Sequence, residues 1–484
     1  MVTFLVCLAI LGVGYVVYGK VVEKIVGYDD SRPTPVHRLA DGVDYVKMPM
    51  WKVLLTQFLN IAGVGPIFGA IMGAMFGPIA FVWITLGCVF VGAVHDYMSG
   101  YVSLRHDGKS VSEIVGIYLG EKVRILMRVF SFILLMLVGV VFTMAPAAWL
   151  AGQTGLTHHT WIFIILGYYV FATIVPVNVL IARLFPILSI LLLFMCVALF
   201  IGMIVGQATG TLTMQEFTLD WQHPGNLPVI PFIFVTIACG AVSGFHSTKS
   251  PMMARCMDKE SDSKPIFFGA MILEGIVALV WAAVAMAVVG DRFRLGYAVI
   301  RDLGGQGAVV DMSSRQLIGD MLPVIGTPLA IFLIIIAIVL FPVTSGDTTF
   351  RSIRLMISDI LKLDQSKVKV RLLISAPVFA IAIALTFIDF DIVWRYFAWS
   401  NLTLAAMALW TGSAFLVKYK RFHWISTIPA AMLTFISVSY ILQAPNEGFG
   451  LPALISNIAG GAAVVLVMIL FMMKAKKATV ESGE

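Results

Sequence analysis

Long apolar runs separated by short polar segments dominate the pattern of this chain. Each run holds about 20 residues, the length that an α-helix needs to cross the hydrocarbon core of a bilayer. The pattern therefore predicts an all-α polytopic membrane protein with thirteen transmembrane helices. The runs fall at residues 4–26, 53–77, 79–104, 121–147, 160–181, 185–207, 228–250, 266–290, 322–350, 371–388, 393–416, 423–443 and 451–473.

The second run is interrupted near its middle by Asn60-Ile-Ala-Gly-Val-Gly-Pro66. Glycine is costly inside a helix, and proline removes a donor and clashes with the carbonyl four residues earlier. Gly63, Gly65 and Pro66 should open the helix at membrane depth, where freed backbone groups are tolerated only against protein or a water-filled cavity. A broken helix here is a candidate binding site. Close packing of small residues is the alternative, because glycines in membrane helices also support it.

A second run, 228–250, carries Ala238-Cys-Gly-Ala-Val-Ser-Gly-Phe-His246, with glycines again near its middle. Each interrupted helix begins a block of five helices, and because five is odd, the two blocks have opposite orientations. This is the pattern of a 5+5 inverted-repeat transporter in which two discontinuous helices meet at the substrate. The expected substrate-binding residues are Asn60, Gly63, Gly65, Pro66, Gly240, Ser243, Gly244 and His246.

The repeat divides the chain into five parts. An N-terminal helix and cytoplasmic loop precede two five-helix repeats, and two further helices and a short cytoplasmic tail follow them. The long loop at 290–321 carries mixed charges, which favour a solvated loop over a folded outer cap. The predicted boundaries are 1–52, 53–210, 228–416, 423–473 and 474–484.

Only 12% of the residues are charged, against about 25% in soluble domains. Most of the 33 lysines and arginines fall in alternate loops, to which we also assign Arg183 and Lys249. By the positive-inside rule, the N-terminus lies outside and the C-terminus in the cytoplasm. The net charge of +6 is thus a topology signal and does not indicate a nucleic-acid partner. The loops expected outside hold only Arg292, Arg294, Arg301 and Arg315.

Ionisable groups at membrane depth are costly and usually functional. His95 and Asp96 lie together in the third helix, and Glu274 lies at a similar depth in the eighth. Histidine titrates near neutral pH, and desolvation moves a carboxyl group toward the same range. The three residues are therefore candidates for proton coupling. A structural His–Asp pair at an inner gate, and a Glu274 paired with a lysine or the backbone, are the alternatives.

Two further charges lie within apolar runs. Asp347 is expected to pair with Arg351 or Arg354, which follow on its helix face at i+4 and i+7. Arg395 lies near the outer side of the eleventh helix, and the sequence assigns it no partner.

Hydroxyl groups cluster in the ninth helix. Together with carbonyls of the broken second helix, they are suited to a hard cation such as Na⁺. Hydrogen bonding back to their own helix is the alternative, because it is common for serine and threonine in membranes. The possible cation site comprises Ala62, Thr344, Ser345 and Thr348, with Thr349 beside them.

Six short motifs follow one another between residues 32 and 248. They are Arg32-Pro-Thr-Pro35, Asp41-Gly-Val-Asp-Tyr45, Ile61-Ala-Gly-Val-Gly-Pro66, Gly92-Ala-Val-His-Asp96, Arg105-His-Asp-Gly-Lys-Ser110 and Ser243-Gly-Phe-His-Ser-Thr248. Together they resemble the carbon starvation protein A (CstA) family, although this chain is shorter than its best-known members. The resemblance implies a bacterial inner-membrane secondary transporter with a LeuT/APC-like core that imports peptides or pyruvate, with protons, during starvation. It carries over the two broken-helix motifs and the His95–Asp96 pair residue by residue.

The expected function is therefore ion-coupled import of a small carboxylate-bearing nutrient, either pyruvate or a short peptide. The positive ends of the half-helices would face its carboxylate. Proton coupling is favoured, with Na⁺ coupling on the same fold or a passive channel as alternatives. An enzyme is least favoured, since no nucleophile–base constellation occurs. No cofactor or metal is expected, because the five cysteines are scattered without a CxxC spacing. The exact substrate and the oligomeric state stay open.

Overall fold

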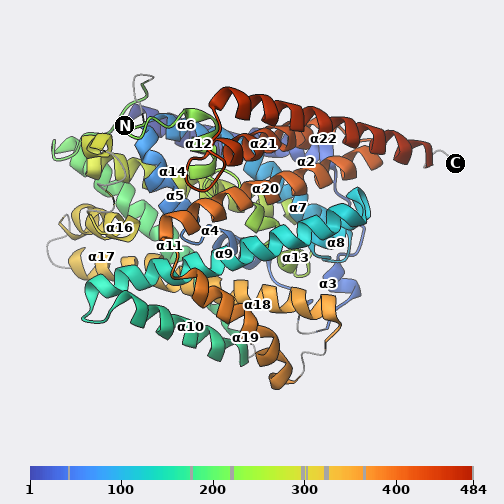
Figure 1. Ribbon diagram of the computed structural model, residues 1–484, viewed down its shortest axis with the longest axis horizontal. Helices are drawn as coiled ribbons and strands as arrows, with labels where there is room; N and C mark the ends of the chain where they lie inside the picture. Colours follow the sequence, from blue (N-terminus) through green and yellow to red (C-terminus); the bar gives the residue numbers. More distant parts are fainter. Residues whose placement is uncertain are drawn as a thin grey trace.

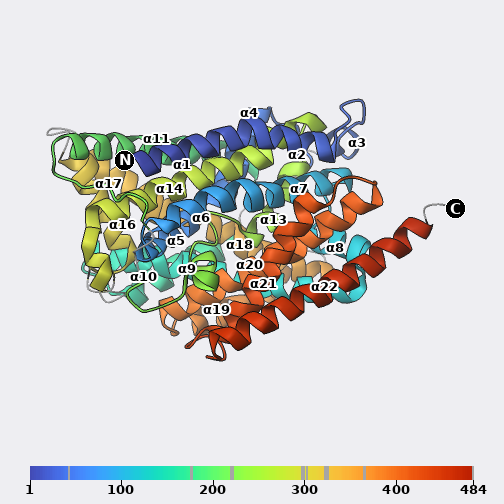
Figure 2. The same ribbon diagram turned by 90° about the horizontal axis from the view of Figure 1, so that it is seen from above.

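The computed structural model describes residues 1–41, 44–174, 178–218, 223–295, 300, 303–320, 326–363 and 367–481. Within these ranges the regular structure is helical, without strands. Most helices run roughly along the longest axis of the molecule (Figure 1). The two termini lie toward opposite ends of that axis in both views (Figures 1 and 2). An odd number of crossings would produce this arrangement.

The N-terminal span, Val2–Val26, is continuous and is followed by the first five-helix repeat. The span consists of α1 (Val2–Val13), the π-helical η1 (Gly14–Tyr18) and α2 (Gly19–Val26), and α3 (Pro35–Arg38) lies in the loop after it. The repeat consists of α4 (Met50–Ala62), α5 (Gly65–Gly73), η2 (Ala74–Phe76), α6 (Ile79–Gly87), η3 (Cys88–Gly92), α7 (Ala93–Arg105), α8 (Val111–Leu119), α9 (Glu121–Gln153), α10 (His158–Ile174) and α11 (Asn178–Ala208).

The second repeat and two further helices complete the chain. The second repeat consists of α12 (Val229–Thr236), α13 (Gly244–Ala254), η4 (Glu260–Asp262), η5 (Lys264–Phe268), α14 (Gly269–Val289), η6 (Gly290–Leu295), α16 (Gln306–Ser314), η7 (Arg315–Gly319), α17 (Gly326–Ile334), η8 (Ile335–Leu340), α18 (Phe341–Leu361), α19 (Val368–Leu385) and α20 (Phe390–Lys418). The last helices are α21 (Trp424–Gln443) and α22 (Ala453–Glu481).

The predicted all-α fold with a 5+5 inverted-repeat core is confirmed. Among the described residues, ten helices are long and apolar enough to span a membrane, and the bent pair α4–α5 is an eleventh candidate. Two of the thirteen expected spans fall outside that count for reasons of length. The helix α10 has 17 residues, and the 228–250 run is divided into α12 and α13.

Burial separates the core helices from those that face lipid. In the spans that contain α7, α14 and α20, 78% of the apolar window is buried inside the protein, against 17% for α22. The exposed side chains of α22 are apolar, as at Leu454 and Ile458. Figure 2 shows α1 and α22 on opposite sides of the bundle. These two peripheral helices therefore cover the repeat core against the bilayer.

The structure contradicts the sequence prediction in three details. The helix α11 begins at Asn178, so Arg183 lies within a helix and its assignment to a loop is wrong. Lys249 lies inside α13 with no solvent exposure, so its loop assignment is also wrong. The expectation of a solvated 290–321 loop fails for residues 306–319. That segment forms α16 and η7, and its side chains Val309 and Leu317 are buried.

The orientation can be tested by cysteine labelling. All five native cysteines are buried, so they should give little background. Lys109 lies in the loop before α8, and Gly155 lies in open space after α9. With the C-terminus in the cytoplasm, Lys109→Cys should react with an impermeant maleimide only from the cytoplasmic side and Gly155→Cys only from outside. The reverse pattern would overturn the orientation. Gly108 is unsuitable for this test, because its φ is +68° and a Cβ there would meet Arg255 at 2.4 Å.

Candidate functional site

The two interrupted helices contact each other at their breaks. The helix α4 ends at Ala62, and α5 begins at Gly65 after a bend of 49°. The helix α12 ends at Thr236, and α13 begins only at Gly244. A Cβ placed on Gly65 would lie 2.6 Å from the Sγ of Cys239, so the two broken segments touch. The repeat therefore brings its two discontinuous helices together in the interior of the protein.

The glycines at the breaks are packed against protein. A Cβ on Gly63 would meet Phe142 at 2.6 Å, and one on Gly240 would meet Ala278 at 2.4 Å. At Gly244 the nearest atom is a backbone oxygen at 2.4 Å. Close packing thus requires small residues here. A leucine at Gly65 would collide with the protein itself, so that substitution would not isolate a role in ligand binding.

The first half of the broken helix carries polar groups without protein partners. Asn60 is 2% exposed, and within the described part of the chain neither its Oδ1 nor its Nδ2 has a hydrogen-bond partner. Thr56, one turn earlier, is buried with its hydroxyl equally unpaired among described residues. Gln57 donates through Nε2 to Ser250 Oγ at 3.4 Å. Buried polar groups normally find partners, so Asn60 is the strongest candidate to contact a ligand.

Four ionisable side chains from three helices form one buried cluster. His95 and Asp96 come from α7, His246 comes from the first turn of α13 and Glu274 comes from α14. All four are 0% exposed. The His95 Nδ1 lies 2.8 Å from Asp96 Oδ1, and the His246 Nδ1 lies 2.9 Å from Asp96 Oδ2. The other nitrogen of His246, Nε2, lies 3.2 Å from Glu274 Oε2. We refer to these four residues as the His–Asp–His–Glu cluster.

Close approach of two backbones positions the cluster. A Cβ on Gly92 would lie 2.2 Å from the carbonyl oxygen of Ala241, which belongs to the unwound stretch between α12 and α13. Only a residue without a side chain fits there. Asp96 follows Gly92 by one helical turn on the same face, so this contact brings its carboxylate to His246. A π-helical turn, η3, ends at Gly92, and such turns occur frequently at functional sites.

The arrangement brings two imidazoles and two carboxyl groups into one connected site, and side chains of these types form proton relays in membrane proteins. Both imidazoles face Asp96 through Nδ1, and His246 lies between two carboxyl groups. An unpaired charge is costly in a site without solvent. The number of protons on the cluster therefore affects how stable this buried arrangement of side chains is. His246, which the sequence places in the substrate site, is thus part of the same network as the predicted proton-coupling residues.

Asn401 of α20 is a residue of the candidate site that the sequence prediction missed. Its Oδ1 accepts hydrogen bonds from the Phe245 N–H at 2.8 Å and from Ser243 Oγ at 3.0 Å. Its Nδ2 lies 3.2 Å from Cys239 Sγ. One amide therefore holds both sides of the break before α13. A buried asparagine in an otherwise apolar run was the signal that could have identified it.

The hydroxyl cluster of α18 bonds largely to its own helix. Thr344 donates to the Leu340 carbonyl at 2.8 Å, and Thr348 donates to the Ser345 carbonyl at 2.9 Å. The Nζ of Lys249 donates to Thr348 Oγ1 at 3.1 Å. The side chain of Lys249 therefore already contacts a residue of the possible Na⁺ site.

The predicted pairing of Asp347 is confirmed. Its Oδ2 lies 3.6 Å from Arg351 Nη2, one turn along α18. Arg354 instead donates to the carbonyl of Thr173 on α10, at 3.0 Å. These arginines thus fasten α18 to neighbouring groups at one end of the bundle.

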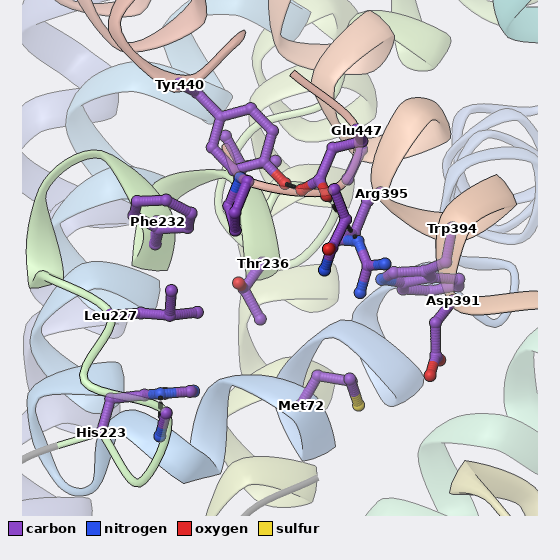
Figure 3. Close-up of a pocket in the computed structure, with 15 residues that line it drawn as sticks. Met72, His223, Leu227, Phe232, Thr236, Asp391, Trp394, Arg395, Tyr440 and Glu447 are labelled. Carbon is purple, nitrogen blue, oxygen red and sulfur yellow. Dashed lines mark hydrogen bonds and ion pairs between the residues drawn. The ribbon is translucent and has the colours of Figure 1, made fainter. Parts of the chain in front are cut away.

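A separate cavity of about 270 Å³ lies beside the ends of α5 and α12 (Figure 3). None of the predicted substrate-binding residues lines it. It is lined by Met72, His223, Gly225, Leu227, Phe232, Val235, Thr236, Asp391, Trp394, Arg395, Ala398, Tyr440, Pro445, Asn446 and Glu447.

Comparison with protein families supports the resemblance seen in the sequence. The model of the carbon starvation protein CstA family matches residues 1–154 and 143–313. The chain belongs to this family. It is 29% identical to a protein of Bacillus subtilis named peptide transporter CstA, over 90% of this chain and 88% of the relative. It is 26% identical to the pyruvate/proton symporter BtsT of Escherichia coli, over 61% of this chain and 51% of that protein.

A solved structure shares the fold of this CstA-family chain. A manganese transporter of Eremococcus coleocola superposes with a TM-score of 0.53 at 13% identity, over 91% of this chain and 99% of that one. At this identity the likeness concerns the fold alone. It supports the inverted-repeat core described above.

The contact between Gly92 and Ala241 gives a testable consequence. Gly92→Ala should force α7 away from the unwound stretch and destabilise the protein by about 1–3 kcal/mol, as overpacking typically does. Gly167→Ala is a matched control, because nothing lies within 4 Å of a Cβ at that position of α10. Thermal unfolding of the two variants in detergent checks this. Equal unfolding temperatures would show that the two backbones do not approach each other this closely.

Proposed function

We propose that this protein is a secondary active transporter of the bacterial cytoplasmic membrane that imports a small carboxylate-bearing nutrient together with protons. The observation that carries the proposal is the His–Asp–His–Glu cluster. It is fully buried and connects α7 of the first repeat with α13 and α14 of the second. Intramembrane ionisable groups of this kind mark proton relays in transporters.

The names of the relatives agree with this chemistry. One is named a peptide transporter and another a pyruvate/proton symporter. Peptides and pyruvate share a carboxylate. An anion that enters a cell with a negative interior moves against the membrane potential, which is worth about 2.3 kcal/mol per charge at 100 mV. A proton carried along offsets that charge, so the cluster supplies what import of a carboxylate requires.

The broken helices and Asn60 support the location of the substrate near the breaks. The N-terminus of α13 begins at the unwound stretch, and helix N-termini favour negative charge. Asn60 presents two buried polar atoms that other described residues do not satisfy. A substrate carboxylate near these groups would lie close to the cluster that carries the proton.

Sodium coupling on the same fold is the second candidate. The position of Lys249 speaks against it, because its Nζ donates to Thr348 Oγ1 at 3.1 Å and so already occupies a hydroxyl that Na⁺ would need. Lys249 is fully buried in α13, so its amine cannot leave this hydroxyl for solvent without a conformational change. This occupied hydroxyl therefore favours the proton over Na⁺.

Asp96→Asn tests the proton role. The amide keeps the size of the carboxyl group but cannot take up a proton, so uptake driven by an acid-outside gradient in proteoliposomes should fall to background. Exchange of labelled for unlabelled substrate, which needs no net proton movement, should persist in part. Glu121→Gln is the matched control, because Glu121 pairs with Arg124 at the exposed start of α9. Acid-driven uptake by the Asp96 variant at the control level would contradict the proposal.

Substitution of the hydroxyl residues of α18 tests the alternative of Na⁺ coupling. Ser345→Ala and Thr348→Ala should leave the ion dependence of uptake nearly unchanged. Thr348 already bonds to its own helix and to Lys249, and the Ser345 hydroxyl, which has no partner among the described residues, is by itself too few ligands for Na⁺. The measurement is initial uptake with pH and Na⁺ gradients imposed separately. If an imposed Na⁺ gradient drove uptake, and both variants abolished that drive, Na⁺ coupling would replace the proton in the account.

A further inference from the structure

The cavity beside α5 and α12 lies toward the N-terminal side of the protein. Its wall includes His223, from the loop that also holds Glu216. The Glu216 carboxylate pairs with the N-terminal amine and accepts from the Thr3 N–H at 2.8 Å. Met72 of α5 and Thr236 of α12 form part of the wall, so a molecule in the cavity lies next to the half-helices that lead to the breaks.

The charged groups of the cavity are of both signs. Arg395 Nε lies 3.0 Å from Glu447 Oε2, and the hydroxyl of Tyr440 donates to the other oxygen of Glu447. Asp391 lies one turn before Arg395 on α20 and also lines the cavity (Figure 3). Burial lowers the pKa of His223 to about 4, so its imidazole is neutral at pH 7. The wall therefore presents one guanidinium and two carboxylates.

The guanidinium of Arg395 is held in place by Glu447 and is accessible from the cavity. The Glu447 side chain is 3% exposed, whereas that of Arg395 is 27% exposed. Arginine has five N–H donors and binds carboxylates in a bidentate manner. The ion pair with Glu447 uses Nε, so the group has capacity for a second carboxylate. Apolar side chains, among them Phe232 and Trp394, form the rest of the wall.

We propose that this cavity is a capture site for a zwitterion, namely a short peptide with both termini free. Its carboxylate binds Arg395, and its ammonium group lies against Asp391. The volume of about 270 Å³ is close to the lower end of the roughly 300–1,000 Å³ typical of small-molecule sites. The inference rests on the proposed import function and narrows its substrate, because pyruvate has a carboxylate but no ammonium group.

Competition binding with the purified protein tests the site without any ion gradient. Bound radiolabelled L-alanyl-L-alanine is measured in the presence of one of four competitors. These are the unlabelled dipeptide, its N-acetyl derivative, its C-terminal amide and pyruvate. Each blocked dipeptide, and pyruvate, should compete at least tenfold more weakly than the free dipeptide, since each loses a charge-assisted contact. If the amide or the acetylated form competed as strongly as the free dipeptide, the proposal would be overturned.

Variants of the cavity residues test which side chain binds each end of the dipeptide. Arg395→Gln should remove the preference for the free carboxylate over the amide, and Asp391→Asn should reduce the preference for the free amine. Arg315→Gln is the matched control, because Arg315 is also paired with an acid, Asp311, at 2.9 Å but lies outside the cavity. It should keep both preferences. If Arg395→Gln fails to fold, the competition series on the unchanged protein still tests whether binding needs both termini of the dipeptide.

The outcomes separate this inference from the proposed function. Binding that needs both termini, without acid-driven uptake in proteoliposomes, would support the capture site and contradict proton-coupled import. Acid-driven uptake of pyruvate that is insensitive to Arg395→Gln, with no dipeptide binding, would overturn the capture site and leave the import function in place.

Discussion

The carboxylate of Asp96 has no contact with solvent, and the centre of the protein depends on how that charge is accommodated. A buried charge is tolerable only when it is paired and hydrogen-bonded. His95 supplies one partner from the same helix, and His246 supplies the other from α13. The second partner is available because Gly92 lets α7 lie against the unwound stretch at Ala241. The need to pair this buried carboxylate therefore holds α7 of the first repeat against α13 of the second.

The same contact links protonation to the shape of the protein. The helix α13 begins at a break whose freed groups are held by Asn401. Protonation of the cluster changes what Asp96 can accept from His246, and therefore changes the free energy of the contact between α7 and α13. A ligand or proton shifts a conformational equilibrium only through such differential interactions. The cluster is placed where a proton can bias the broken helices that would hold the substrate.

Much of the fold follows from one-dimensional patterns. The apolar runs and the glycine and proline interruptions predicted the spans and both breaks, because helix formation in a bilayer depends mainly on local composition. His95 and Asp96 were selected as candidates from the same pattern, because they are ionisable residues within an apolar run. The partnership of Asp96 with His246 could not be predicted, since it joins residues 150 positions apart in the chain. Lys249 was misassigned because a lysine at the end of an apolar run resembles a loop residue, whereas tertiary packing buries it.

The central claim is that the cluster carries the coupling proton, and proton movement itself tests it most directly. A pH-sensitive dye enclosed in proteoliposomes that contain the wild-type protein reports acidification of the lumen when dialanine or pyruvate is added outside, with no ion gradient imposed. The account predicts that substrate entry acidifies the lumen, with and without Na⁺ present. Substrate entry without acidification, accompanied by Na⁺ uptake, would contradict it.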